Sequence, residues 1–183
     1  MSVVSSNRNN VWRPWRAGAR SRVPAAVAGW IRDEGSLTQR LRARCGARFN
    51  VRVVAQGWVR PEWSERQVLG LRDFETAWVR VVVLGCGRAP WVVARTVMPR
   101  ATLTGRLQRL LKLGNRPLGA VLFADKTMQR EAFEFATIAG HDALLQRAGV
   151  RVTAKRVFGR RAVFRLDNKS LLVSEFFLPA LLI

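Results

Sequence analysis

The chain has 183 residues, of which 49% are hydrophobic and 24% charged, and a formal net charge of +20. This composition is typical of one globular domain and excludes a disordered chain, and its apolar stretches are shorter than the ~20 residues that cross a bilayer. The single histidine, His141, excludes most histidine-rich metal sites, and the isolated Cys45 and Cys86 argue against a disulfide framework. Because the N-terminus also lacks the features of a secretory signal, we expect a protein of the reducing cytoplasm.

The positive charge comes mostly from arginine, which supplies 28 of the 32 basic residues. Lysine and arginine that neutralise phosphates drive nucleic-acid binding, so such binding is one interpretation of the composition. The arginines are scattered along the chain, however, except for a denser set before residue 60. We therefore do not expect nucleic acid as the main partner, and regard a weak association with anionic membranes as a secondary property.

The N-terminal third divides into an arm and the start of a domain. Residues 1–22 lack clear periodicity and are predicted to be a flexible basic arm, whereas 23–183 are predicted to form one domain. Pro24 can open a helix to about residue 32, and Ser36 is a suitable N-cap for a helix over 37–44. The β-branched residues of 49–59 predict a strand, and the charged segment 61–73 predicts a loop with a short helix near 64–69.

Two β-rich runs, 78–84 and 91–98, are joined by a loop containing two glycines and a proline, which predicts a hairpin. If the loop closes with Leu84 opposite Trp91, then Arg80 lies directly opposite Arg95 on one apolar face. Like charges in this position destabilise a sheet, and a bound anion between them would remove the conflict. The prediction depends on register, because a slip of one residue places the two arginines on opposite faces.

The C-terminal half is predicted to contain a helix, a short turn or helix, and further strands. The expected elements are a helix over 102–113, a proline-started turn or short helix over 117–123, a helix over 138–148, and strands over 150–158, 161–166 and 171–177. Residues 129–137 fit either a strand or a helix. Free N–H groups at the start of 117–123 could bind an anion, and 167–169 form a compact hairpin loop.

An acid, Glu175, lies in the middle of the apolar run 171–179. In a strand it shares a face with Leu171, Val173 and Phe177, where a carboxylate costs several kcal/mol unless it is paired or hydrogen-bonded. Two interpretations are open. Glu175 forms an ion pair with an arginine that holds the sheet together, or it makes a hydrogen bond to the hydroxyl of a buried ligand.

Four segments in order, 91–99, 113–119, 158–161 and 171–179, closely resemble the chorismate lyase family, and the resemblance covers about residues 30–180. The resemblance implies conversion of chorismate to 4-hydroxybenzoate and pyruvate, the first step of ubiquinone biosynthesis, without metal or cofactor. The implied fold is α+β and similar to the UTRA ligand-sensing domains of transcription regulators. It has a single antiparallel sheet of about six strands, with helices around it and flaps over an internal ligand pocket.

The resemblance also implies the site. Arg80, Arg95 and Glu175 would be catalytic, and Leu37 and Leu118 would join them in binding substrate through the backbone of flap segments. The arginines would hold the two carboxylates of chorismate, and Glu175 would meet its hydroxyl. The likeness favours a strand for residues 129–137.

Two departures from the family are the arginine-rich N-terminus and about a dozen residues around 139–153, which look inserted. We expect a monomer. The rival functions are a non-catalytic ligand-binding domain and an arginine-rich nucleic-acid-binding protein.

Overall fold

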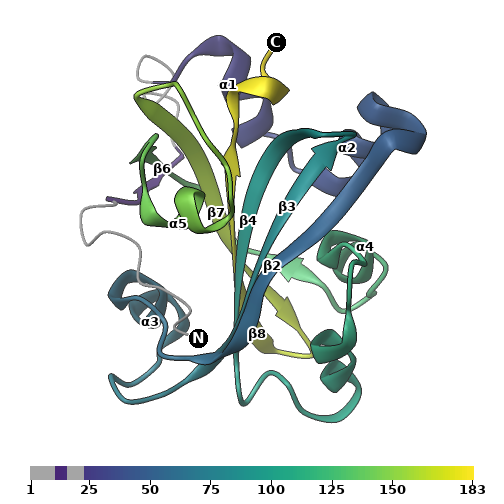
Figure 1. The fold of residues 1–183 in the computed structure, drawn as a ribbon. Coiled ribbons are helices and arrows are strands. Elements are labelled where there is room, and N and C mark those ends of the chain that lie inside the picture. The colour runs from purple at the N-terminus through teal and green to yellow at the C-terminus, as the bar shows by residue number, and fades with distance from the viewer. Residues whose placement is uncertain (1–10, 16–22) are drawn as a thin grey trace.

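The computed structural model describes residues 11–15 and 23–183, and within them one eight-stranded antiparallel sheet forms the centre of the fold (Figure 1). The strand order is β1-β6-β7-β8-β4-β3-β2, and β5 pairs with β7 outside this path. The strands are β1 (Arg13–Pro14), β2 (Phe49–Val59), β3 (Ala77–Cys86), β4 (Ala89–Pro99), β5 (Gln129–Arg130), β6 (Glu134–Ala139), β7 (Arg156–Leu166) and β8 (Lys169–Phe177). The α+β class with a single antiparallel sheet is confirmed. The strand count exceeds the expected six because of the two-residue strands β1 and β5.

Short helices surround the sheet. They are α1 (Ala25–Ile31), α2 (Leu37–Cys45), α3 (Trp63–Leu69), α4 (Leu118–Phe123) and α5 (Ala143–Arg147), with 3-10 turns η2 (Gly46–Arg48), η3 (Gly105–Lys112) and η4 (Pro179–Leu181). Ser36 caps α2 as predicted, its hydroxyl accepting from the N–H of Gln39 at 3.4 Å. The helix expected over 102–113 is instead the 3-10 helix η3. The helix expected over 138–148 shortens to α5, because its first two residues belong to β6.

Strand β7 replaces the two separate strands expected over 150–158 and 161–166. Gly159 does not interrupt it, although a glycine often weakens a strand. An added Cβ at Gly159 would lie 2.5 Å from the ring of Phe176 on the neighbouring strand. The glycine therefore makes room for this aromatic ring while the strand continues past it.

The β3–β4 hairpin exists, but its predicted register is wrong. Arg80 pairs with Thr96, and Val81 pairs with Arg95, so the two arginines lie on opposite faces of the sheet. The loop is tighter than expected, because Cys86 pairs with Ala89, and an irregularity after Leu84 then shifts the pairing by one residue. The proposed arginine pair on one face is thereby removed.

The β7–β8 hairpin turns through Asp167 and Asn168, whose φ angles of 48° and 61° lie in the left-handed region that Asp and Asn tolerate. Leu166 pairs with Lys169 beside this two-residue turn. Counting back along the strands puts Arg160 opposite Glu175. A tight turn thus fixes which charged side chains meet 6 residues away from it.

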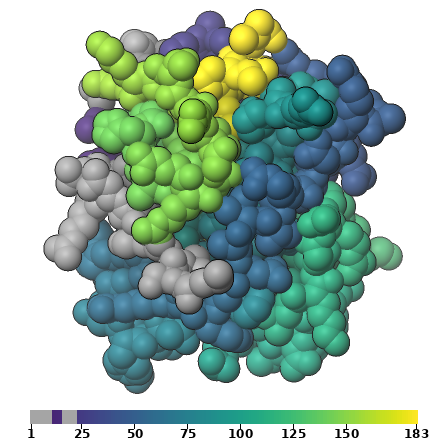
Figure 2. Space-filling view, viewed as in Figure 1, coloured from purple at the N-terminus to yellow at the C-terminus, as the bar shows by residue number. Residues whose placement is uncertain are grey.

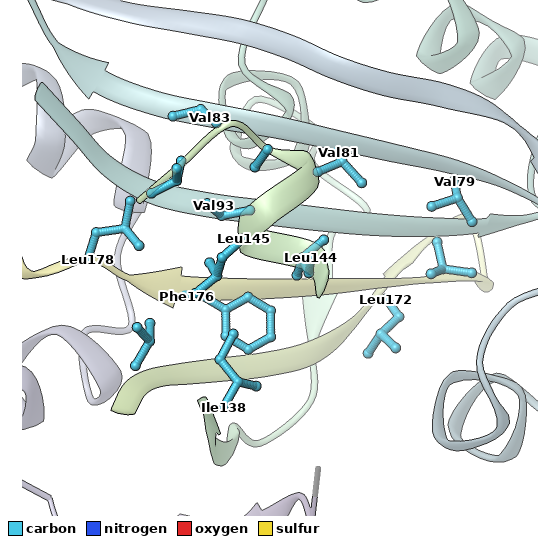
Figure 3. Packing of buried hydrophobic residues seen from close by; sticks show 14 of the residues in the cluster. Val79, Val81, Val83, Val93, Ile138, Leu144, Leu145, Leu172, Phe176 and Leu178 are labelled. Carbon is cyan, nitrogen blue, oxygen red and sulfur yellow. The ribbon is translucent and has the colours of Figure 1, made fainter. Parts of the chain in front are cut away.

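One face of the sheet is covered by the segment that looks inserted, residues 139–153. Leu144 and Leu145 of α5 are buried against the sheet and pack in one cluster with Val83, Val93 and Phe176 (Figure 3). The same segment covers part of the near surface in Figure 2. Residues of this segment therefore complete the hydrophobic core on this face.

The opposite face carries two further apolar clusters with a gap between them. One gathers around α1, α2 and the end of the sheet where β3 and β8 finish, and includes Trp30, Leu41 and Phe177. The other gathers around η3 and α4, and includes Leu107 and Phe164. The gap is the pocket described below.

Part of the predicted arm is joined to the sheet. Within residues 11–15, strand β1 pairs with β6, Trp12 packs against Phe176 and Trp15 packs edge-on against Phe135. The other arm residues, 1–10 and 16–22, lie outside the described residues. Among the residues that the structure describes, no helix is both long and apolar enough to cross a membrane.

Cys45 and Cys86 form a disulfide, contrary to the expectation from their isolation in the sequence. Cys45 is the last residue of α2, and Cys86 ends β3. The bond therefore ties α2 to the β3–β4 hairpin.

We predict that replacing both cysteines, Cys45→Ser with Cys86→Ser, lowers the free energy of unfolding under oxidising conditions. The bond closes a loop of 41 residues, and the chain-entropy estimate for a loop of this length is about 4 kcal/mol. Urea denaturation would measure the change, and with reductant the wild type and the variant should unfold alike. Equal stability without reductant would contradict a formed disulfide.

Candidate active site

A pocket lies on the sheet face opposite α5, between the sheet and the segments that carry α2 and α4. Strands β3, β4, β7 and β8 supply its floor. Its lining is Gly35, Leu37, Thr38, Arg80, Val82, Leu84, Ala94, Thr96, Pro117, Leu118, Gly119, Leu122, Phe123, Arg130, Arg160, Phe164, Val173 and Glu175. Most of these side chains are apolar, and the charged ones are three arginines and one glutamate. Such a lining suits a flat organic anion with few polar groups.

Arg80 reaches the pocket from β3, and its residue is 2% exposed. Its Nη2 donates to the carbonyls of Gly114 and Arg116, at 2.7 and 3.2 Å. Its Nε and Nη1 are buried without a hydrogen-bond partner among the described residues. Burial also lowers the pKa of this guanidinium. A buried cation with two unused donors and no carboxylate partner among the described residues suits an anionic group of a ligand.

Glu175 reaches the same pocket from β8 and pairs with Arg160 of β7. The Nε of Arg160 donates to Glu175 Oε2 at 2.7 Å, and the two side chains are 3% and 17% exposed. Arg160 also donates through Nη1 to the carbonyls of Trp30 and Asp33. The ion-pair interpretation of Glu175 therefore holds for one oxygen. Its other oxygen, Oε1, makes no hydrogen bond with a described residue and remains free for a ligand hydroxyl.

The two flap segments meet over the pocket. Leu37 and Thr38 open α2, Leu118 and Gly119 open α4, and all four residues line the cavity. A Cβ added to Gly119 would lie 2.9 Å from Thr38 Oγ1, closer than real contacts allow. Glycine at this position thus permits the two flaps to touch.

Arg95 lies on the other face of the sheet and does not line the pocket. Its Nε and Nη2 donate to Glu65 of α3 at 2.7 and 3.0 Å, and Glu62 lies 4.0 Å away. Burial alone would lower the pKa of Arg95, but the charge and hydrogen bonds of Glu65 outweigh it and raise the pKa. The guanidinium is therefore already occupied by a carboxylate of the chain.

The structure brings together four of the five expected site residues, Leu37, Arg80, Leu118 and Glu175, around one cavity. It adds Arg130 and Arg160, which the sequence analysis did not place there. The position of Arg160 could have been predicted from the sequence, because a two-residue turn at Asp167 and Asn168 puts it opposite Glu175. No comparable signal pointed to Arg130, since residues 129–137 fitted either a strand or a helix.

Residues 11–15 and 23–183 contain no group of three His, Cys, Asp or Glu side chains placed to hold a metal ion. What the pocket offers is different. It presents buried, unpartnered arginine donors at one side, a free carboxylate oxygen with cationic neighbours at another, and apolar walls between. This arrangement can bind and orient an anion that also carries a hydroxyl.

Comparison with known proteins identifies the family, because residues 7–182 match the family described as chorismate lyase. The chain belongs to that family. A probable chorismate pyruvate-lyase of Methylococcus capsulatus is 46% identical over 157 residues, which cover 85% of this chain and 96% of that protein. A probable chorismate pyruvate-lyase of Aromatoleum aromaticum is 42% identical, over 89% of this chain and 90% of its own length.

Solved structures that resemble this chorismate lyase family member include transcription regulators and an effector domain of one. The effector domain of PhnF from Mycobacterium smegmatis superposes with a TM-score of 0.55, covering 79% of this chain and 89% of that one, at 15% identity. A GntR-family regulator from Bacillus cereus gives the same TM-score at 13% identity, over 73% of this chain and 93% of its own. These likenesses confirm the expected fold relationship to ligand-sensing domains and carry no more than the fold.

We predict that Gly119→Ala weakens binding of 4-hydroxybenzoate about tenfold, because the added methyl group forces the flaps apart at ~1–3 kcal/mol. Isothermal titration calorimetry would measure the dissociation constant. Adding Thr38→Ala removes the hydroxyl at 2.9 Å and leaves the next contact at 3.6 Å. The double variant should therefore bind more tightly than Gly119→Ala alone, and an equal or greater loss would reject a steric conflict between the flaps.

We predict that Glu65→Gln lowers the free energy of unfolding by about 3 kcal/mol, because it leaves the buried Arg95 without its charge partner. Urea denaturation would measure this loss. The affinity of the folded variant for 4-hydroxybenzoate should stay within twofold, roughly the scatter of distant sites. Unchanged stability with a large loss of affinity would instead give Arg95 a place at the ligand.

Proposed function

We propose that this chorismate lyase family member eliminates pyruvate from chorismate in the pocket between the flaps and the sheet, and releases 4-hydroxybenzoate. The observation that carries this proposal is that Arg80 is buried with two unpartnered donors and no carboxylate of the described residues beside it. A buried cation that lacks an anion is costly, and a substrate carboxylate supplies the missing charge and a hydrogen-bond acceptor.

The product carries the two polar groups that the charged side chains of the pocket can bind. 4-Hydroxybenzoate carries its hydroxyl opposite its carboxylate across a flat ring. Its carboxylate binds a free donor of Arg80, and its hydroxyl donates to Oε1 of Glu175. Between them, the ring packs against apolar side chains such as Val82, Leu122 and Val173, which line the cavity.

The reaction needs little beyond positioning. The ether bond between the ring and the enolpyruvyl oxygen breaks, and a proton leaves the ring carbon that carries the hydroxyl. The electron pair of that C–H bond completes the aromatic ring, and the departing enolate becomes pyruvate by taking a proton at its methylene carbon. Because aromatisation drives the step, the side chains need only hold the substrate and stabilise charge on the leaving group.

The residues of the family resemblance receive these roles in the proposal. Arg80 holds the ring carboxylate, Glu175 orients the hydroxyl, and Leu37 and Leu118 close over the ligand with their flap segments. Arg95 takes a supporting part, since its donors are filled by Glu65. It anchors α3 to the far face of the sheet and thereby stiffens strand β4, whose Ala94 and Thr96 line the pocket.

The remaining proposals concern the oligomeric state, location, cofactors and partners of the protein. We propose a monomer that works in the cytoplasm without metal or cofactor. Several of its arginines are used internally, as in the pairs of Arg95, Arg160 and Arg161 with glutamates. This internal use favours weak association with anionic membranes over a nucleic-acid partner.

We predict that purified protein releases pyruvate from chorismate, measured by coupling to lactate dehydrogenase and NADH. Arg80→Gln should lose about 100-fold in affinity for 4-hydroxybenzoate, because a buried, charge-assisted hydrogen bond is removed. Glu175→Gln should lower kcat/KM at least ~10-fold, the scale of one charged hydrogen bond.

Arg165→Gln serves as the control for these variants, because Arg165 is an exposed arginine of β7 that pairs with Glu131. It should behave as the wild type. Well-folded wild-type protein that binds 4-hydroxybenzoate but releases no pyruvate would replace the enzyme with a non-catalytic ligand-binding domain.

A further inference from the structure

Beside Arg80 and Arg160, the pocket contains a third cation, Arg130, that the binding of 4-hydroxybenzoate does not use. It lies in β5, where its backbone pairs with Phe164 of β7, and both residues line the cavity. Its guanidinium carbon sits 4.3 Å from the centre of the Phe133 ring, and that of Arg160 sits at the same distance from the same ring. Two guanidinium groups therefore share one aromatic side chain near Glu175.

The two arginines differ in how many of their donors are occupied. Arg160 donates to Glu175 and to two backbone carbonyls, and its side chain is 3% exposed. Arg130 donates only once among the described residues, from Nη1 to the carbonyl of Glu34 at 2.6 Å, and it pairs with no described carboxylate within 4.0 Å. Its remaining N–H groups are available to a ligand.

The surroundings of Arg130 also disfavour the charged form of its side chain. Burial lowers its pKa first, and the neighbouring charge of Arg160 lowers it further. The carboxylates of Glu34, Glu175 and Asp33 raise the pKa of Arg130 but offset only part of this effect. An additional anion beside Arg130 would relieve the repulsion and strengthen its own binding in the low-dielectric pocket.

The substrate has such an anion where the product has none. In chorismate, the enolpyruvyl ether is on the ring carbon next to the one with the hydroxyl, so its carboxylate lies at the hydroxyl end of the molecule. When the ring carboxylate is on Arg80 and the hydroxyl on Glu175, this second carboxylate lies at the Glu175 side of the pocket. That side is where Arg130 and Arg160 are found.

We propose that Arg130 binds the enolpyruvyl carboxylate of chorismate and so distinguishes the substrate from 4-hydroxybenzoate. This proposal rests on the chorismate lyase function proposed above. Arg130 thereby has the role that the family resemblance implied for Arg95, which is to bind a carboxylate of chorismate. During elimination it stays on the same carboxylate, which leaves as part of pyruvate, and it stabilises the enolate that forms when the ether bond breaks.

Substituting Arg130 should separate substrate from product. For Arg130→Gln we expect kcat/KM for chorismate to fall about 30-fold, mainly through KM, the scale of a lost hydrogen-bonded charge pair. The dissociation constant of 4-hydroxybenzoate should stay within twofold, since the product lacks the enolpyruvyl group. Arg130→Lys should recover part of the loss because it keeps the charge, and Arg165→Gln should match the wild type in both measurements.

Coupled pyruvate assays give the kinetic constants, calorimetry gives the product affinity, and thermal unfolding checks that each variant is folded. Equal losses for chorismate and 4-hydroxybenzoate would overturn the proposal, because Arg130 would then act on the whole pocket. Wild-type kinetics in Arg130→Gln would overturn it as well.

Failure of the enzymatic function is a separate result. If the wild type releases no pyruvate, calorimetry with chorismate still tests whether Arg130 contacts this ligand. Weaker chorismate binding in Arg130→Gln, with unchanged 4-hydroxybenzoate binding, supports the contact in a non-catalytic pocket. Equal chorismate binding by both proteins, or none by the wild type, overturns it.

Discussion

The register of the β3–β4 hairpin determines the chemistry of this molecule. Side chains of a strand alternate between faces, so the one-residue shift after Leu84 sends Arg80 to the pocket and Arg95 to α3. With the simpler register, two arginines would face each other across the hairpin on one side of the sheet. The observed register instead gives each face one buried arginine and lets the two be neutralised in different ways.

The buried arginines share a pattern that singles out Arg80. Among the residues that the structure describes, five arginines are buried, and four of them pair with a carboxylate of the chain, namely Arg66 with Asp73, Arg95 with Glu65, Arg160 with Glu175 and Arg161 with Glu134. Arg80 has backbone carbonyls on one nitrogen and nothing on two others. The fold thus satisfies its structural cations internally and leaves one for a ligand.

The limits of sequence reasoning lie in long-range geometry. Strand periodicity predicted that Glu175 shares a face with Val173, and capping chemistry at Ser36 predicted the start of α2. The β3–β4 register could not be derived, because an irregularity of one residue has no distinct sequence pattern and inverts every face assignment. The bond between Cys45 and Cys86 and the entry of Arg130 into the pocket depend on tertiary packing of segments far apart in the chain, which local patterns do not encode.

The pocket arginines also connect ligand binding to the flap. Arg160 donates hydrogen bonds to the carbonyls of Trp30 and Asp33, and Arg130 donates to that of Glu34. Both arginines therefore bind the chain between the end of α1 and the start of α2. The same guanidinium groups that line the pocket therefore also position the segment that leads into α2. The disulfide fixes the other end of α2 to the hairpin. Both ends of α2 are thus held by specific bonds, and this places Leu37, its first residue, at the pocket.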